Sequence, residues 1–159
     1  ESGWLPKPDT LQKLALAPQD GPVLQAAYKN TNTRLWTVIR PLCAAEVGSE
    51  KTADRIGLDT CTHLVIDSTR AKDADAANEA MRQVGEVRAG LRPDVEPSLQ
   101  GSPVAKMFFA LTSERKLFEG ELAQSLGPEE AHRVTFAEGM CMHTSIFGGP
   151  GPRPDPKTK

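Results

Sequence analysis

One stretch, residues 21–43, constrains the fold more than any other, because its apolar residues recur at the spacing of a helix face. They alternate at steps of four and three, at Leu24, Tyr28, Thr31, Leu35, Val38 and Leu42. Pro22 stands where a first-turn proline is tolerated, and we expect Pro41 to kink or stop the helix within the next turn. A helix with one apolar face needs other helices to cover it, which favours an all-α fold.

A second periodic stretch, residues 73–90, repeats the three-four spacing and carries it on to Leu91. Its apolar residues are Ala77, Ala80, Val84, Val87 and Leu91. Gly85 weakens this helix in the middle, and we interpret it as a point of close packing against a neighbour.

Caps and helix breakers delimit the remaining expected helices, which cover residues 9–17, 49–57, 60–70, 102–126 and 128–139. Asp9 or Thr10 caps the first of them, and Asp59 caps the helix at 60–70. The segment 60–70 is short enough to be a strand, and we take it as helix. Thr112 or Ser113 either continues or restarts the helix that begins at 102.

The prediction is therefore an all-α protein, an irregular bundle of five to seven helices in a single domain, residues 1–147. Residues 1–8 are expected to form an extended arm, and residues 148–159 a flexible Pro/Gly-rich tail. Aromatic residues make up only 5% of the 159 residues, so we expect an aliphatic core between helices and not an aromatic-rich β-sandwich.

The formal net charge of −2 argues against nucleic-acid binding, which needs a basic stripe. The chain begins at Glu1 without an initiator methionine. We interpret this as a processed product whose leader or membrane anchor is missing from the N-terminus. Together with the Pro/Gly-rich tail, this start favours an exported, periplasmic protein.

Three cysteines leave several uses open. Cys43 and Cys61 bracket a short connector between two expected helices. A disulfide between them would stabilise the fold by about 3 kcal/mol on the chain-entropy model. Cys141 would then be the odd thiol.

A competing hypothesis is a metal site, because Cys-x-His occurs twice. The four residues are Cys61, His63, Cys141 and His143. Two thiolates and two imidazoles suit tetrahedral zinc, and both groups also suit copper. Cys43 or His132 is a possible further ligand in this hypothesis.

Two further patterns carry chemistry. Cys61 lies in the first turn of the helix that Asp59 caps, where the helix dipole lowers a thiol pKa. This suits a thiol-dependent redox protein or enzyme with His63 or another imidazole as base. Glu129 and His132 form a single Glu-x-x-His, a unit that di-iron bundles use twice. The chain has no second copy to complete such a site.

Three segments share a phrase of Leu, a small or capping residue and a polar helix start, at residues 16–20, 111–115 and 126–130. This phrase resembles the Leu-Thr-x-x-Gln repeats of the Spy/CpxP-type periplasmic helical proteins, a family of chaperones and envelope-stress sensors. Leu111 and Thr112 match the first two positions, whereas Arg115 stands where that family has Gln. The resemblance implies an exported, helical, non-enzymatic domain.

The leading hypothesis is thus an exported, periplasmic helical domain that binds or regulates another protein without catalysis. A zinc- or copper-binding protein is the first alternative. A thiol-dependent redox protein or enzyme centred on Cys61 is the second.

Overall fold

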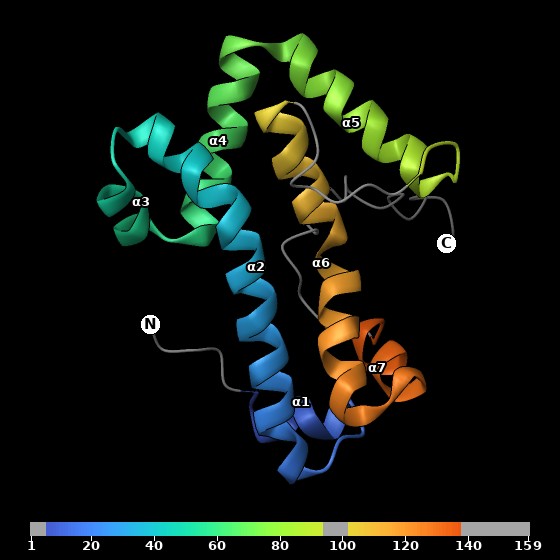
Figure 1. The fold of residues 1–159 in the computed structure, drawn as a ribbon. Helices are drawn as coiled ribbons and strands as arrows, with labels where there is room; N and C mark the ends of the chain where they lie inside the picture. The colour runs from blue at the N-terminus through green and yellow to red at the C-terminus, as the bar shows by residue number, and fades with distance from the viewer. Residues whose placement is uncertain (1–5, 94–101, 138–159) are drawn as a thin grey trace, which may run out of the picture.

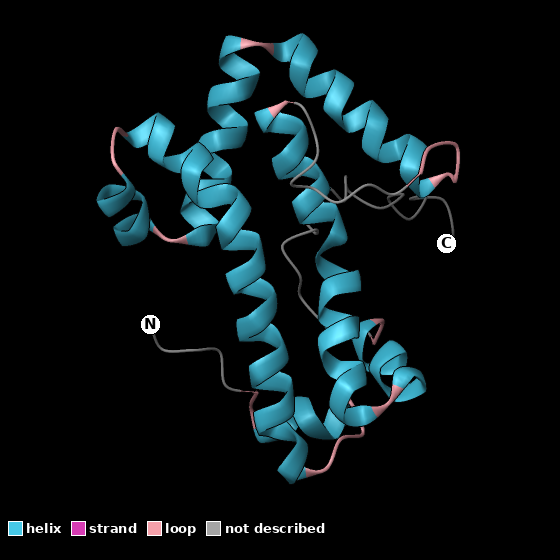
Figure 2. Ribbon diagram, in the orientation of Figure 1, coloured by secondary structure: helices cyan, strands magenta, loops and turns pink. Residues whose placement is uncertain are grey.

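The computed structural model describes residues 6–93 and 102–137, and every regular element in these ranges is helical (Figure 2). Seven α-helices and one short 3-10 turn, with no strand, make up this part of the chain. The all-α prediction is confirmed, including the helix over 60–70.

The elements follow one another as α1 (Pro8–Lys13), the 3-10 turn (Pro18–Asp20), α2 (Gly21–Val47), α3 (Glu50–Ile56), α4 (Leu58–Lys72), α5 (Ala74–Arg88), α6 (Pro103–Leu126) and α7 (Pro128–Thr135). Helix α1 begins earlier than predicted, with Lys7 as its N-cap and Pro8 in its first turn. The expected caps Asp9 and Thr10 therefore lie inside the helix, because a proline without an N–H is well suited to the first helical position.

Helices α2 and α6 are the two long elements and lie side by side along the molecule (Figure 1). Helices α1 and α7 lie at the lower end of this pair in Figure 1, and α3, α4 and α5 lie at the upper end. Helix α4 packs on α2, and α5 returns to pack on α6. Among the helices of the described ranges, none combines the length and the apolar character needed to cross a membrane.

The buried apolar side chains form two clusters, and both take residues from α2 and α6. The upper cluster contains Ile39, Cys43, Ala53, Cys61, Val65, Ile66, Ala80, Val84, Val104, Ala105, Met107, Phe108, Phe109 and Leu111. The lower cluster contains Leu11, Leu14, Leu16, Leu24, Ala27, Phe118, Leu122, Ala131 and Val134. Residues 107–111 of α6 are all buried, so this part of α6 is enclosed by its neighbours on every side.

The buried face of α2 differs in part from the predicted stripe. Leu24, Thr31 and Leu35 are buried as expected. The other predicted positions are only partly buried, namely Tyr28, Val38 and Leu42, and their places are taken by Ala27, Ile39 and Cys43. Each four-residue step advances the helix face by about 40°. The buried face therefore winds around α2 as its neighbours change from the lower to the upper cluster.

Pro41 does not stop α2, which continues to Val47 and ends at Gly48 with a φ of 84°. Pro41 itself is exposed, so the Thr37 carbonyl that loses its helical donor lies on the solvent side, where water can replace it. Beyond the proline, Cys43 and Glu46 attach the end of α2 to α4. Tertiary contacts thus override the local signal to end the helix.

Two predictions for α5 are wrong. Leu91 is 80% exposed, because it follows Gly90, whose φ of 72° reverses the chain, and the Leu91 N–H donates to the Glu86 carbonyl across the helix end. This is a Schellman cap, which takes Leu91 out of the helical register. Gly85 has no heavy atom within 4 Å of where a Cβ would stand, so it marks no close approach.

Helix α1 ends with the same cap, but a non-glycine residue occupies its left-handed position. Ala15 has a φ of 52°, while Leu16 donates to the Leu11 carbonyl and Ala15 donates to the Gln12 carbonyl. Leu11 and Leu16 are both buried in the lower cluster, which holds this cap in place. An L-residue with a Cβ is strained in this conformation.

We expect Ala15→Gly to stabilise the protein by about 0.5–1 kcal/mol, because it relieves that strain at an exposed position. Urea unfolding of the purified variant measures the change. The matched control is Ala26→Gly, the same change at an exposed right-handed position of α2, which should destabilise by about 0.5–1 kcal/mol. Equal effects of the two substitutions would contradict the assignment of strain to Ala15.

Candidate functional site

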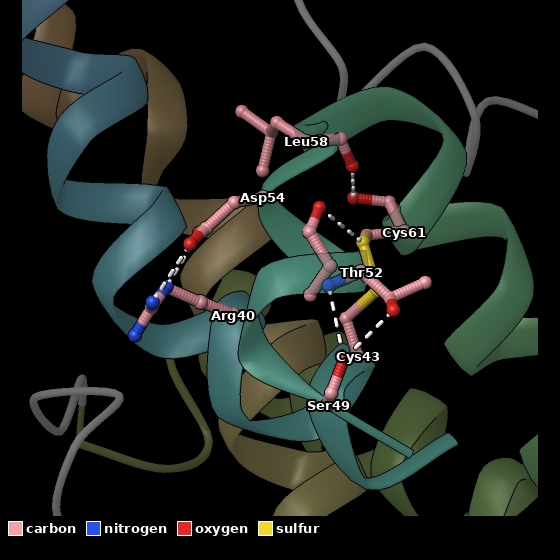
Figure 3. Close-up of a disulfide and its surroundings, with 9 residues drawn as sticks. Arg40, Cys43, Ser49, Thr52, Asp54, Leu58 and Cys61 are labelled. Carbon is pink, nitrogen blue, oxygen red and sulfur yellow. Dashed lines mark hydrogen bonds and ion pairs between the residues drawn. A yellow bond between two sulfur atoms is a disulfide. The ribbon is translucent and has the colours of Figure 1, made fainter. Parts of the chain in front are cut away.

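A disulfide joins Cys43 of α2 to Cys61 of α4, with 5.4 Å between their Cα atoms (Figure 3). This is the pairing that the sequence predicts. Both cysteines are fully buried in the upper cluster. The bond closes a loop with a sequence separation of 18 that contains all of α3. We call residues 41–61, which contain the end of α2, all of α3 and the start of α4, the disulfide corner.

Helix α3 has the boundaries that the sequence indicates. Ser49 caps it by accepting a hydrogen bond from the Thr52 N–H at 3.1 Å, and Gly57 ends it with a φ of 83°. Gly57 also serves as the N-cap of α4. The prediction that Asp59 caps this helix is therefore wrong, and Asp59 lies within its first turn. The Sγ atom of Cys61 lies 3.7 Å from the Ala53 carbonyl oxygen, a packing contact because the oxidised sulfur carries no proton.

The outer side of the disulfide corner is clamped by Arg40 of α2. Its guanidinium donates to both carboxylate oxygens of Asp54 at 2.7 and 2.9 Å and lies 2.9 Å from Glu50 (Figure 3). The hydrogen bond from Arg40 holds the pKa of Asp54 below its usual range. The pair therefore contributes stability above the ordinary carboxyl pKa and loses it as the pH falls through the lowered one.

A second polar contact fixes the last turn of α2. Glu46 accepts hydrogen bonds from Lys72 at 2.7 Å and from Ser68 at 2.6 Å, both on α4. The bond from Lys72 is the main reason why the pKa of Glu46 is lowered. Arg40, Cys43 and Glu46 thus attach the last turns of α2 to α3 and α4.

The structure describes only two of the four residues of the metal hypothesis. Cys61 is bonded to Cys43, and His63 is exposed on α4. Cys141 and His143 lie outside the described residues. Within 6–93 and 102–137, no group of three or more His, Cys, Asp or Glu side chains is placed to hold a metal ion. A zinc or copper site that uses Cys61 requires the reduced chain, and in that form it stays a prediction.

The thiol hypothesis likewise requires Cys61 to be reduced. A nucleophilic or metal-binding cysteine needs a thiolate, and the sulfur of Cys61 is oxidised and fully buried. Cys61 does lie in the first turn of α4, as predicted, but the position serves the disulfide.

The Glu-x-x-His unit of α7 has a structural use. His132 Nδ1 lies 2.8 Å from the Glu119 carboxylate of α6, and its ring lies 4.6 Å from that of Phe136. The guanidinium of Arg115, on α6, lies over the same Phe136 ring, 5.6 Å from the ring centre. These contacts hold α7 against α6.

Sequence reasoning missed a groove between α2 and α6. It has a volume of about 300 Å³ and is lined by Pro22, Val23, Ala26, Ala27, Asn30, Glu121, Gln124 and Ser125. Glu121, with a side chain only 9% exposed, accepts from Asn30 at 2.8 Å and pairs with Arg34 at 2.9 Å. No local pattern joins these residues, because Asn30 and Glu121 are 91 positions apart.

Comparison with protein families, with curated proteins and with solved structures finds no match to this chain. The resemblance to Spy/CpxP-type proteins therefore stays a prediction. The geometry of the disulfide corner and of the groove is what supports a function.

Two buried hydroxyls were also unexpected. Thr31 of α2 and Thr135 of α7 are each 1% exposed, and neither Oγ1 atom has a hydrogen-bond partner within the described part of the chain. Thr31 belongs to the predicted apolar stripe, but its unsatisfied hydroxyl cannot be read from the spacing. An unsatisfied buried hydroxyl destabilises the folded state.

We expect Thr31→Val to stabilise the protein by about 1 kcal/mol, because a methyl group of similar shape replaces the unpaired hydroxyl. Thermal and urea unfolding measure the change. Thr33→Val on the exposed face of α2, where the hydroxyl donates to the Lys29 carbonyl, is the matched control and should change stability by less than about 0.5 kcal/mol. A loss of stability in Thr31→Val would show that the hydroxyl is satisfied.

Proposed function

We propose that this protein is an exported, periplasmic helical domain that binds or regulates another protein and does not act as an enzyme. The observation that carries the proposal is the buried Cys43–Cys61 disulfide. Disulfides persist in oxidising compartments and are rare where thiols are kept reduced. A bond placed inside the upper cluster acts as part of the scaffold.

The shifted pKa values support a non-catalytic role. Each belongs to a surface ion pair that holds its charge more firmly than usual, as in Glu79, whose hydrogen bond with Arg82 lowers its pKa to about 2. Arg133 lowers the pKa of Glu130 in the same way. Acid–base catalysts instead need a pKa near the working pH. These pairs suit the surface of a scaffold.

The groove between α2 and α6 is the proposed binding face. Its apolar lining of Pro22, Val23 and Ala26 is bordered by the amide and hydroxyl groups of Gln124 and Ser125. The volume of about 300 Å³ lies at the small end of ligand pockets, which suits one aliphatic side chain better than a whole organic ligand. Arg34 pairs with the carboxylate of Glu121, so the groove offers no free charge. The fitting partner is a peptide segment with a small aliphatic residue between neutral polar groups.

Export and oxidation are tested on the native protein from its source cells. We expect it in the exported fraction, with at most one of the three cysteines alkylated after denaturation and all three alkylated after reduction. Mass spectrometry of the intact chain counts the labels. Three labels without reduction, or a cytosolic protein, would contradict the proposal. About one equivalent of zinc or copper in the same sample would favour the metal-binding alternative.

Binding is tested with a phage-displayed library of random peptides selected on the purified chain. We expect selected peptides to bind Ala26→Arg at least tenfold more weakly than the unmodified protein, because the long side chain fills the groove. Ala45→Arg, on an exposed position of α2 outside the groove, is the matched control and should bind normally. Fluorescence anisotropy measures the affinities. No enriched peptide, or equal affinity for the two variants, would refute the groove as the binding face.

A further inference from the structure

We propose that the Cys43–Cys61 bond is a redox latch on the disulfide corner. Reduction opens residues 41–61 locally, while the lower cluster stays folded. This conformational device is independent of the proposed partner and of the compartment. It rests on the weak points of the backbone near the bond, and on the small number of fully buried side chains in the corner.

The first weak point is Pro41. It offers no N–H to the Thr37 carbonyl, so the helical hydrogen bonding of α2 is interrupted just before the corner. In the preceding turns, the Thr33 hydroxyl donates to the Lys29 carbonyl at 2.9 Å, and the Thr37 hydroxyl donates to the Thr33 carbonyl at 3.0 Å. Prolines and such side-chain bonds are where helices bend. The end of α2 is therefore a separable segment.

The second weak point is α3. It has seven residues, only Ala53 among them is buried, and a left-handed glycine stands on each side of it. A helix of this length is unstable by itself, because nucleation is unfavourable and few bonds propagate it. The glycines that flank it, Gly48 and Gly57, have φ values of 84° and 83°. We take them as the points about which the segment can turn.

The polar restraints on the corner lie at the surface, whereas Cys43, Ala53 and Cys61 pack in the upper cluster. The Arg40 side chain is 33% exposed, and its partners Asp54 and Glu50 are 47% and 66% exposed. Lys72, the partner of Glu46, is 69% exposed. Exposed ion pairs are screened by water and salt, so even the bidentate Arg40–Asp54 pair adds only a modest restraint. The corner is kept closed by the covalent bond and by the apolar contacts of its few buried side chains with the upper cluster.

The reductant is a dithiol. Its first thiolate attacks one sulfur to give a mixed disulfide, and its second thiol resolves it. The Cys43–Cys61 bond thereby gains two electrons and two protons, and the dithiol becomes a disulfide. Because both sulfurs are fully buried, attack requires the corner to open first. Opening is therefore a required first step of the reduction.

Hydrogen exchange measured by mass spectrometry tests the latch. The full chain carries Cys141→Ser, so that no third thiol exchanges, and is compared in its oxidised form and after dithiothreitol. We expect amides of residues 42–56 to exchange at least tenfold faster after reduction. Amides of residues 24–31 and 118–122, in the lower cluster, should change less than threefold. Equal acceleration of amide exchange in all these segments, as global unfolding would give, would overturn the proposal. So would unchanged exchange in residues 42–56.

The variant Pro41→Ala tests the contribution of the proline separately from that of the disulfide. It restores an N–H for the Thr37 carbonyl, so in the reduced chain it should slow exchange in residues 42–47 at least threefold relative to Pro41. Unchanged exchange would overturn the proposed break in α2. Reduction should also be at least tenfold slower in the native chain than in the chain unfolded in urea, because the buried sulfurs are reached only after opening. Equal rates in the two states would overturn the need for opening.

Discussion

The packing of α2 against α6 is the constraint on which the rest of the structure depends. Both apolar clusters contain residues of these two helices, Leu24 and Phe118 in the lower one and Ile39 and Phe108 in the upper one. The shorter helices complete the clusters, α4 with Val65 and Ile66 for example, whereas α3 adds Ala53 alone. They are stable because they cover surfaces that the long pair leaves open.

The upper cluster adds a covalent restraint to this packing. The Cys43–Cys61 bond holds α4 on the end of α2, and α5 then returns from α4 to α6 (Figure 1). The same bond closes the one part of α2 that Pro41 has weakened. The disulfide corner therefore contains both the covalent restraint and the weakened part of α2. The groove lies beside the lower cluster, in a part of the α2–α6 pair that the bond does not span.

Much of the fold could be predicted because its signals are local. Ser49 accepts a backbone hydrogen bond at the start of α3, as its sequence position indicates, and Asp73 does the same at the start of α5. The errors had both distant and local causes. Pro41 would stop an isolated helix, and Leu91 continues a periodicity that the chain reversal at Gly90 ends. The groove was invisible because its two walls come from opposite ends of the sequence.

By itself the sequence determined the all-α class and the bounds of α3 at Ser49 and Gly57, and it gave the Cys43–Cys61 disulfide as one of several uses of the cysteines. These depend on hydrogen bonds and spacings within a few residues, or on a short loop between two cysteines. Only the tertiary structure decided which face of α2 is buried, how Glu121 meets Asn30 and Arg34, and how α2 continues past Pro41. Those outcomes depend on which helices become neighbours, and the free energy of that packing exceeds the local preferences of single residues.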